Sequence, residues 1–240
     1  MIYLKNIEKN TKLILNKISL FPYTKLAIAT KTHFNFDVLN SALNCNKNII
    51  IAENRIQEAE EKWEVLQQFP HKKHFIGTLQ SNKVKKAVEM FDCIETVDSL
   101  KLLIRINKIA GDMGKKLEIF LNINISEDKN KSGISLEKLD NFISEIVIYI
   151  NAKNLNNIKI SGLFTILKND LSNEKKNEYY AQMKKLQIAL QTKIPSIIEL
   201  SMGMSGDYTI ALQEGATIVR VGQGIFGKRE CVNFALLNKK

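Results

Sequence analysis

The feature that most constrains the fold is an alternation of two hydrophobic periods along the chain. Short apolar runs of strand length are each followed by a stretch whose apolar residues recur every three or four positions. The runs are continuously apolar, which is typical of parallel strands buried on both faces. The eight expected strands span residues 25–32, 48–54, 73–77, 93–98, 117–126, 158–166, 197–205 and 217–227.

Segments with helical spacing fill the intervals between these strands. The stripe after residues 117–126 consists of Leu136, Leu139, Ile143, Ile146 and Ile150. Ser99 is expected to open the helix after the fourth strand, because serine is a favoured N-cap. An extra helix is expected before the first strand, from the spacing of Leu4, Ile7, Thr11, Ile14 and Ile18.

Eight strand–helix units in 240 residues match the length of a minimal (β/α)8 barrel. No linker rich in proline, glycine or serine divides the chain, so we expect a single domain over residues 1–240. An open, doubly wound sheet is the alternative, because βαβ alternation alone does not distinguish the two folds.

Charge and composition narrow the class of protein. The net charge is +10, but the lysines are spread along the chain among glutamates, as on solvated helix faces. We therefore expect no nucleic-acid partner, while a small anionic ligand remains compatible. No apolar run is long enough to span a bilayer, and the first residues do not resemble a secretory signal. These observations predict a cytoplasmic protein without a membrane partner.

Cysteine and histidine spacing argues against a metal site or a disulfide framework. The cysteines are far apart and odd in number, and no carboxylate stands at a ligand-like spacing with both neighbouring histidines. These residues are Cys45, Cys93 and Cys231, together with His33, His71 and His74.

The segment R-V-G-Q-G-I-F-G, residues 220–227, fits the pattern G-x-G-x-x-G. A dinucleotide-binding turn needs a second strand ending in an acid about twenty residues later. Only Glu230 is acidic among residues 228–240, so that interpretation is excluded. In a barrel, the loops after strands seven and eight often bind a phosphate instead. Here these loops are 201–207 and 221–224, and Ser205 is also expected to cap the helix after strand seven.

Two cations are expected on the same side of the barrel, Lys31 at the end of the first strand and Arg220 inside the eighth. Lys31 ends the first strand, and burial there would lower the pKa of its amine and make it a nucleophile. A phosphate-binding site opposite such an amine suggests a phosphate-bearing carbonyl compound that is held as a Schiff base. The alternatives are a lysine that reaches solvent from a strand end and, for Arg220, a structural salt bridge.

The sequence resembles the pyridoxal phosphate homeostasis protein family, which is related to the N-terminal barrel of alanine racemase. The segments that carry the resemblance are L-A-I-A-T-K-T (26–32), A-E-N-R-I-Q-E-A (52–59), H-F-I-G-T-L-Q-S-N-K (74–83), I-N-I-S-E-D-K-N-K-S-G (123–133), L-S-M-G-M-S-G-D (200–207) and R-V-G-Q-G-I-F-G (220–227). The departures are Ala52, Thr78 and Gln223, where the family usually has glycine, proline and a small hydroxyl residue.

The resemblance implies a role for each matching position around pyridoxal 5′-phosphate. Lys31 would hold the cofactor as a Schiff base, and Arg220 would face its pyridine nitrogen. Asn54 and Lys131 would lie at the rim of the cofactor. The phosphate would be surrounded by Ser201, Ser205, Gly222 and Gln223.

The resemblance also implies a function in intracellular pyridoxal phosphate (vitamin B6) homeostasis, with cofactor-requiring apoenzymes as recipients and the protein a monomer. We expect no catalytic turnover, because an arginine beside the pyridine nitrogen makes the ring a poor electron sink. The family of alanine racemases takes its second base, a tyrosine, from a separate C-terminal domain, which we expect this chain to lack. The alternative is a pyridoxal-phosphate-dependent amino-acid racemase of weak activity.

Overall fold

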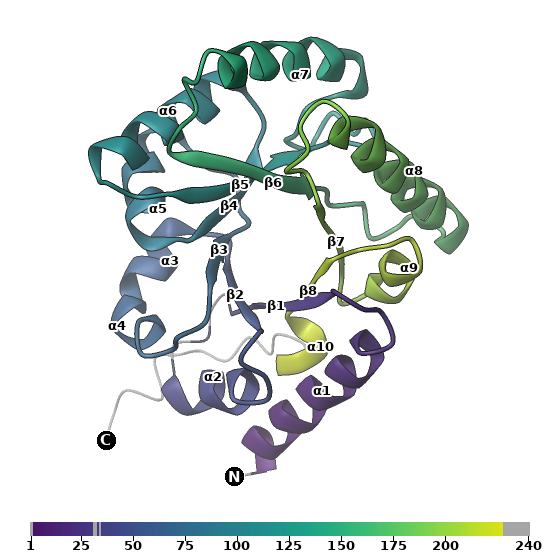
Figure 1. The fold of residues 1–240 in the computed structure, drawn as a ribbon. Coiled ribbons are helices and arrows are strands. Elements are labelled where there is room, and N and C mark those ends of the chain that lie inside the picture. The colour runs from purple at the N-terminus through teal and green to yellow at the C-terminus, as the bar shows by residue number, and fades with distance from the viewer. Residues whose placement is uncertain (1, 31–32, 34, 228–240) are drawn as a thin grey trace.

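The computed structural model describes residues 2–30, 33 and 35–227. Eight parallel strands form a closed barrel in which every strand pairs with its neighbours in sequence and β8 pairs with β1. Figure 1 shows this ring with the helices outside it. The (β/α)8 prediction is confirmed, and the open doubly wound alternative is wrong, because Lys25–Ile28 of β1 run in register with Ile218–Val221 of β8.

The elements follow the predicted alternation. The strands are β1 Lys25–Ala29, β2 Ile50–Glu53, β3 Lys73–Phe75, β4 Cys93–Val97, β5 Leu117–Asn122, β6 Ile158–Phe164, β7 Glu199–Met204 and β8 Ile218–Val221. The helices are α1 Ile2–Ile18, α2 Phe36–Leu43, α3 Ile56–Glu61, α4 Trp63–Leu66, α5 Val84–Met90, preceded by the 3₁₀ turn η1 Ser81–Lys83, α6 Leu100–Asp112, α7 Leu136–Asn151, α8 Asn173–Gln191, α9 Tyr208–Gln213 and α10 Gln223–Phe226.

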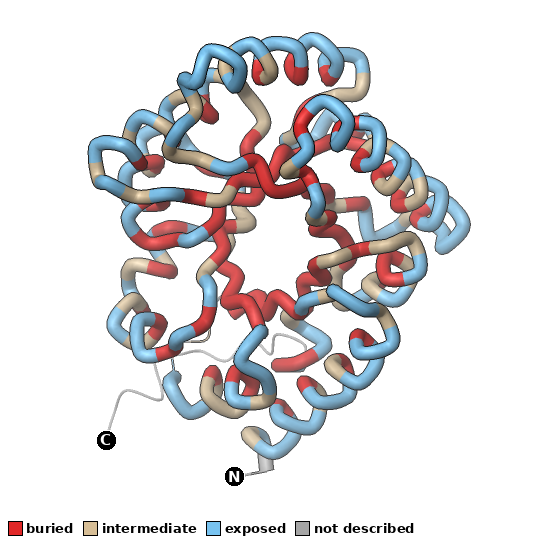
Figure 2. Tube along the Cα trace, in the orientation of Figure 1, coloured by how far each residue is buried: buried red, intermediate tan, exposed pale blue. Residues whose placement is uncertain are grey.

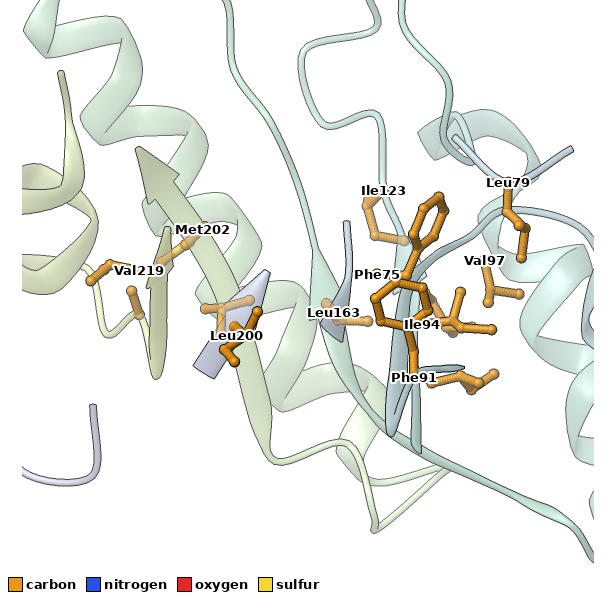
Figure 3. Close-up of a cluster of buried hydrophobic side chains, with 14 of the residues drawn as sticks. Phe75, Leu79, Phe91, Ile94, Val97, Ile123, Leu163, Leu200, Met202 and Val219 are labelled. Carbon is orange, nitrogen blue, oxygen red and sulfur yellow. The ribbon is translucent and has the colours of Figure 1, made fainter. Parts of the chain in front are cut away.

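The core has two shells, separated by the barrel wall. Strand residues alternate between the faces, as the pleat requires. The inner shell consists of Ala27, Ile50, Ala52, Cys93, Phe120, Phe164 and Ile218. The outer shell joins the strands to the helices, and Figure 3 shows part of it, including Phe75, Ile94, Leu163, Leu200 and Val219. Because both faces of the strands are covered, the ring is almost continuously buried in Figure 2.

The N-terminal helix is confirmed as an addition to the barrel. Its expected stripe is buried at Ile7, Thr11, Ile14 and Ile18. It lies against α2 and α10, and Asn10 Nδ2 donates to the carbonyl of Ile225 at 3.1 Å. The two ends of the described chain therefore meet beside β1 and β8.

The helices α6 and α7 test two local predictions. Ser99 caps α6 as expected, since its hydroxyl accepts the backbone N–H of Leu102. The stripe of α7 is buried at Leu139, Ile143 and Ile146, but Ile150 is 38% exposed because it lies in the last turn. The cap is confirmed, and the stripe is confirmed except at its final residue.

The eighth strand is shorter than predicted. It ends at Val221, and Gln223–Phe226 form the short helix α10. The carbonyl of Gly222 accepts N–H groups from both Ile225 and Phe226, which turns the apolar run from strand to helix.

A buried ion pair interrupts the helical stripe after β2. The hydrophobic spacing predicts one helix over 56–66, but the chain forms α3 and α4 with a break at Lys62 (φ −112°, ψ 14°). Lys62 Nζ lies 2.7 Å from Glu53 Oε1, and both side chains are fully buried. The hydroxyl of Thr30 also bonds to Glu53. This pair anchors the helix break against the end of β1.

None of the helices in the described part of the chain combines the length and apolar character needed to cross a lipid bilayer.

Replacing Lys62 should destabilise the protein strongly. Lys62→Met leaves the Glu53 carboxylate buried without its cation, at a cost of about 3–5 kcal/mol in the free energy of unfolding. Denaturant unfolding measures this loss. The double variant Glu53→Gln with Lys62→Met should recover most of it. Lys72→Met, which breaks the more exposed pair with Glu118, should change stability by less than about 1 kcal/mol.

Candidate functional site

The carboxyl ends of the strands bring most of the predicted site residues to one mouth of the barrel, as expected for this fold. Arg220 and Ser201 are the most buried of them. The Arg220 side chain points inward from β8 and is 3% exposed. Nη1 donates to Ser201 Oγ at 2.7 Å, Nη2 donates to the carbonyl of Thr165 at 2.7 Å, and the guanidinium lies 4.2 Å from the centre of the Phe164 ring. The guanidinium is therefore fixed on three sides.

Ser201 connects Arg220 to an acid that sequence reasoning missed. The Ser201 hydroxyl bonds to Glu95 Oε2 at 2.6 Å, and His74 Nδ1 lies 2.5 Å from Glu95 Oε1. Both Glu95 and His74 are buried. The available signal was strand parity, because Glu95 lies two residues after Cys93, an inward residue paired in register with His74.

These residues also form a group of ligand-type atoms. One atom each of His74, Cys93 and Glu95 lies within 4.8 Å of the others, inside the barrel. Burial raises the pKa of the Cys93 thiol well above its ordinary value, which keeps that sulfur protonated. The direct bond between His74 and Glu95 accounts for the clustering.

A second feature of the mouth is a convergence of backbone donors at the start of α10. The N–H groups of Gly222 and Gly224 both point at Ser205 Oγ, at 3.3 and 3.2 Å. The prediction that Ser205 caps the helix after β7 is wrong, since α9 has Asp207 at its N-cap position. The hydroxyl turns instead toward β8, because the two glycine N–H groups lack helical acceptors there.

Hydrogen bonds to Asp207 fix the loop that carries Ser205. Asp207 Oδ1 accepts the N–H of Met204 at 2.7 Å, and the hydroxyl of Tyr180 donates to Asp207 Oδ2 at 3.0 Å. Burial raises the pKa of the Tyr180 hydroxyl, so that it remains a donor. This support fixes Ser205 relative to Gly222.

Gly222 and Ala29 lie beside these donors, and their small size lets the two strands approach each other closely. A Cβ added to Gly222 would lie 3.2 Å from the carbonyl oxygen and 3.4 Å from the Cβ of Ala29. The inward faces of β1 and β8 therefore approach closely at this height. Gln223 follows as the first residue of α10, and its side chain is exposed.

Asn54 lies at the end of β2, as predicted. Its side-chain oxygen is buried and has no hydrogen-bond partner within the described structure. A buried amide oxygen without a partner is unfavourable, and it marks a position where a donor from a ligand would be accommodated. Gly77 packs directly against the Asn54 backbone.

Lys131 lies in the loop after β5, across the mouth from β1. Its Nζ donates to the carbonyl of Ile166 at 2.9 Å. It lines a cavity of about 280 Å³ together with Thr96, Asn122 and Phe164, among other residues. Partial burial lowers the pKa of the Lys131 amine.

Lys31, the predicted attachment point, lies outside the described residues. The structure thus brings Ser201 and Arg220 together, places Ser205 against Gly222, and puts Asn54 and Lys131 at the same mouth.

Comparison with known proteins identifies the family. The profile of the family described as alanine racemase, N-terminal domain, matches residues 2–230. The pyridoxal phosphate homeostasis protein of Synechocystis sp. is 41% identical over 180 residues, which are 74% of this chain and 80% of that protein. The chain belongs to the pyridoxal phosphate homeostasis protein family. This confirms the resemblance found in the sequence motifs.

Solved structures share this fold. PipY of Synechococcus elongatus with PLP bound has a TM-score of 0.77 and 32% identity, over 92% of this chain and 100% of that one. The same protein without PLP has a TM-score of 0.81 and 33% identity, over 90% of this chain and 99% of that one. The alanine racemase of Streptomyces lavendulae, at 12% identity, has a TM-score of 0.74 over 94% of this chain and 58% of its own, which shows the common barrel alone.

The contact between Gly77 and Asn54 predicts an effect of a single methyl group. In Gly77→Ala the new Cβ would lie 1.9 Å from the Asn54 carbonyl oxygen, so the end of β2 must move. We expect a loss of about 1–3 kcal/mol in the free energy of unfolding, measured with denaturant. Gly206→Ala is the control, because a Cβ there meets nothing within 4 Å. Equal stability of the two variants would contradict the packing described.

Proposed function

We propose that this protein is a single domain that binds pyridoxal 5′-phosphate at the barrel mouth and acts in cellular pyridoxal phosphate homeostasis. The observation that carries the proposal is the Arg220 guanidinium fixed inside the barrel, two residues before a pair of convergent backbone donors. The guanidinium suits the nitrogen of an aromatic ring, and the backbone donors suit a phosphate.

The donor pair at α10 fits the phosphate. Gly222 and Gly224 already direct their N–H groups at one oxygen, that of Ser205. A phosphate oxygen beside the Ser205 hydroxyl would accept the same donors and receive a hydrogen bond from the hydroxyl. Gln223 would add its backbone N–H from between the two glycines. The phosphate role of Ser201 stays a prediction, and its hydroxyl is engaged with Glu95 and Arg220.

Arg220 fits the ring nitrogen. Arginine carries five N–H donors, and the bonds to Ser201 and Thr165 use two of them. When bound, pyridoxal phosphate supplies an aldehyde that condenses with an amine and a ring that withdraws electrons. Because arginine only donates, Arg220 would hold the ring nitrogen in its neutral form and so limit the withdrawal of electrons.

Lys31 supplies the amine that attaches the cofactor in this proposal. It stands two residues after Ala29, the last residue of β1, in the sequence. Asn54 offers its unpartnered amide oxygen to a donor of the ligand, and Lys131 bounds the mouth on the far side. The three residues together would orient the cofactor between β1, β2 and the loop after β5.

The proposal extends to binding without turnover. Relatives up to 41% identical carry the name pyridoxal phosphate homeostasis protein, and PipY has been solved with PLP bound. An arginine at the ring nitrogen is a poor arrangement for stabilising a carbanion, which supports storage and delivery rather than chemistry. We propose a cytoplasmic monomer whose recipients are apoenzymes that require the cofactor.

Reduction with borohydride tests the attachment. Protein mixed with pyridoxal phosphate should turn yellow, and borohydride should fix a pyridoxyl group on Lys31, located by peptide mass spectrometry. Lys31→Ala should lose the colour and the adduct. Lys85→Ala, which replaces an exposed lysine on α5, should retain both. An adduct found only on other lysines would contradict the proposed site.

The alternative function is amino-acid racemisation, and Lys131 is the observation that favours it. Its lowered pKa and its place across the mouth suit a second base. We expect the protein loaded with pyridoxal phosphate to racemise alanine no faster than a trace rate above that of free pyridoxal phosphate. Chiral chromatography of the alanine measures this rate. Racemisation removed by either Lys31→Ala or Lys131→Met would establish the alternative instead.

A further inference from the structure

Arg220 is a buried cation without a direct acidic partner among the described residues. Its hydrogen bonds to Ser201 and Thr165 go to a hydroxyl and to a carbonyl, both of which are neutral. A buried charge is stable only when its field is compensated nearby. The nearest compensating carboxylate along the hydrogen-bond network is Glu95, one hydroxyl away.

The hydrogen bonds along this path are compatible with a chain of donors from Arg220 to Glu95. Arginine only donates hydrogen bonds, so Ser201 Oγ accepts from Arg220 and keeps its own proton available for an ionised Glu95. Glu95 therefore accepts at Oε2. It also meets Nδ1 of His74 at Oε1, and an ionised carboxylate is the species that accepts at both oxygens.

The electrostatics agree with an ionised Glu95. Burial alone would raise its pKa, but the hydrogen bond with His74, the charge of Arg220 and the Ser201 hydroxyl together lower it. For Arg220, burial lowers the pKa, and Glu95 is the leading charge that opposes this effect, ahead of Tyr180 and Asp207.

We propose that Glu95 is a positioning residue of the cofactor site, which acts through Ser201 to hold Arg220 in place and to offset part of the positive charge presented to the ring. This inference rests on the proposed function for its second half, because the ring belongs to pyridoxal phosphate. Its first half concerns the protein without cofactor and is tested separately.

The first experiment is a double-mutant cycle on thermal unfolding of the cofactor-free protein. Glu95→Gln and Arg220→Met should each lower the midpoint, because each leaves one buried charge uncompensated. The double variant should unfold no lower than the worse single one. Glu60→Gln, a carboxylate on α3 paired with Lys86 outside the barrel, should add simply to Arg220→Met. Simple additivity of Glu95→Gln with Arg220→Met would overturn the proposal.

Ser201→Ala provides a second variant that keeps both charges. It removes the hydroxyl between them, so Glu95→Gln in that background should cost fewer degrees than in the wild type. An unchanged cost would show that Glu95 does not act through Ser201. This comparison remains decisive if Arg220→Met fails to fold.

The second experiment follows the visible absorption of the protein loaded with pyridoxal phosphate as the pH is raised. Glu95→Gln leaves more positive potential at the ring, which disfavours the protonated, cationic form of the bound chromophore. The pH midpoint should therefore fall by on the order of one unit. The groups facing Glu95 are His74, Cys93, Ser201 and Arg220. Glu60→Gln should leave the midpoint in place.

The outcomes separate the two proposals. A wild-type protein that takes up no pyridoxal phosphate refutes the proposed function, while the unfolding cycle still decides whether Glu95 holds Arg220. A coupled cycle with an unchanged midpoint in Glu95→Gln would overturn the offset of charge at the ring. A midpoint that rises would overturn it as well, because the sign would be opposite.

Discussion

The positive charge of Arg220 inside the barrel is the constraint on which the site depends. A barrel interior of this kind is normally filled by apolar layers, and here Phe120, Phe164 and Ile218 supply them. Placing a guanidinium among them requires acceptors on several strands. Thr165 follows β6, Ser201 lies on β7 and Glu95 on β4, so the charge links strands that are distant in sequence.

The polar groups inside the barrel also differ with their height along the strands. The lower carboxylates, such as Glu118 and Glu199, pair with lysines near solvent at strand starts, and such pairs contribute little. The buried groups at mid-height form the network around Arg220. Above them, the mouth presents backbone N–H groups and an amide oxygen. Along the strand direction, the interior thus changes from exposed ion pairs to a buried polar network and then to backbone donors at the mouth.

The fold was predictable because hydrophobic periodicity repeats in every unit, so that small errors at strand ends do not alter the topology. Site candidates could be named from the sequence where a polar or charged residue stands in or just after an apolar strand, as Arg220, Ser201 and Asn54 do. Glu95 was missed because its importance arises from contacts across the barrel, which depend on register and parity. The helix α10 was missed because its apolar residues are equally compatible with a continued strand, and the change depends on the hydrogen bonds that Gly222 accepts.

The closure of the barrel by β8 against β1 has a consequence for synthesis on the ribosome. The N–H donors of Gly222 and Gly224 lie after β8, α1 packs against α10, and Lys31 follows β1 in the sequence. These segments are separated by nearly the whole chain, and contacts of such long range form late in folding. A nascent chain that lacks its last strand has neither Arg220 nor the backbone N–H donors that follow it. A ligand that binds at this mouth would therefore bind only chains in which β8 has paired with β1.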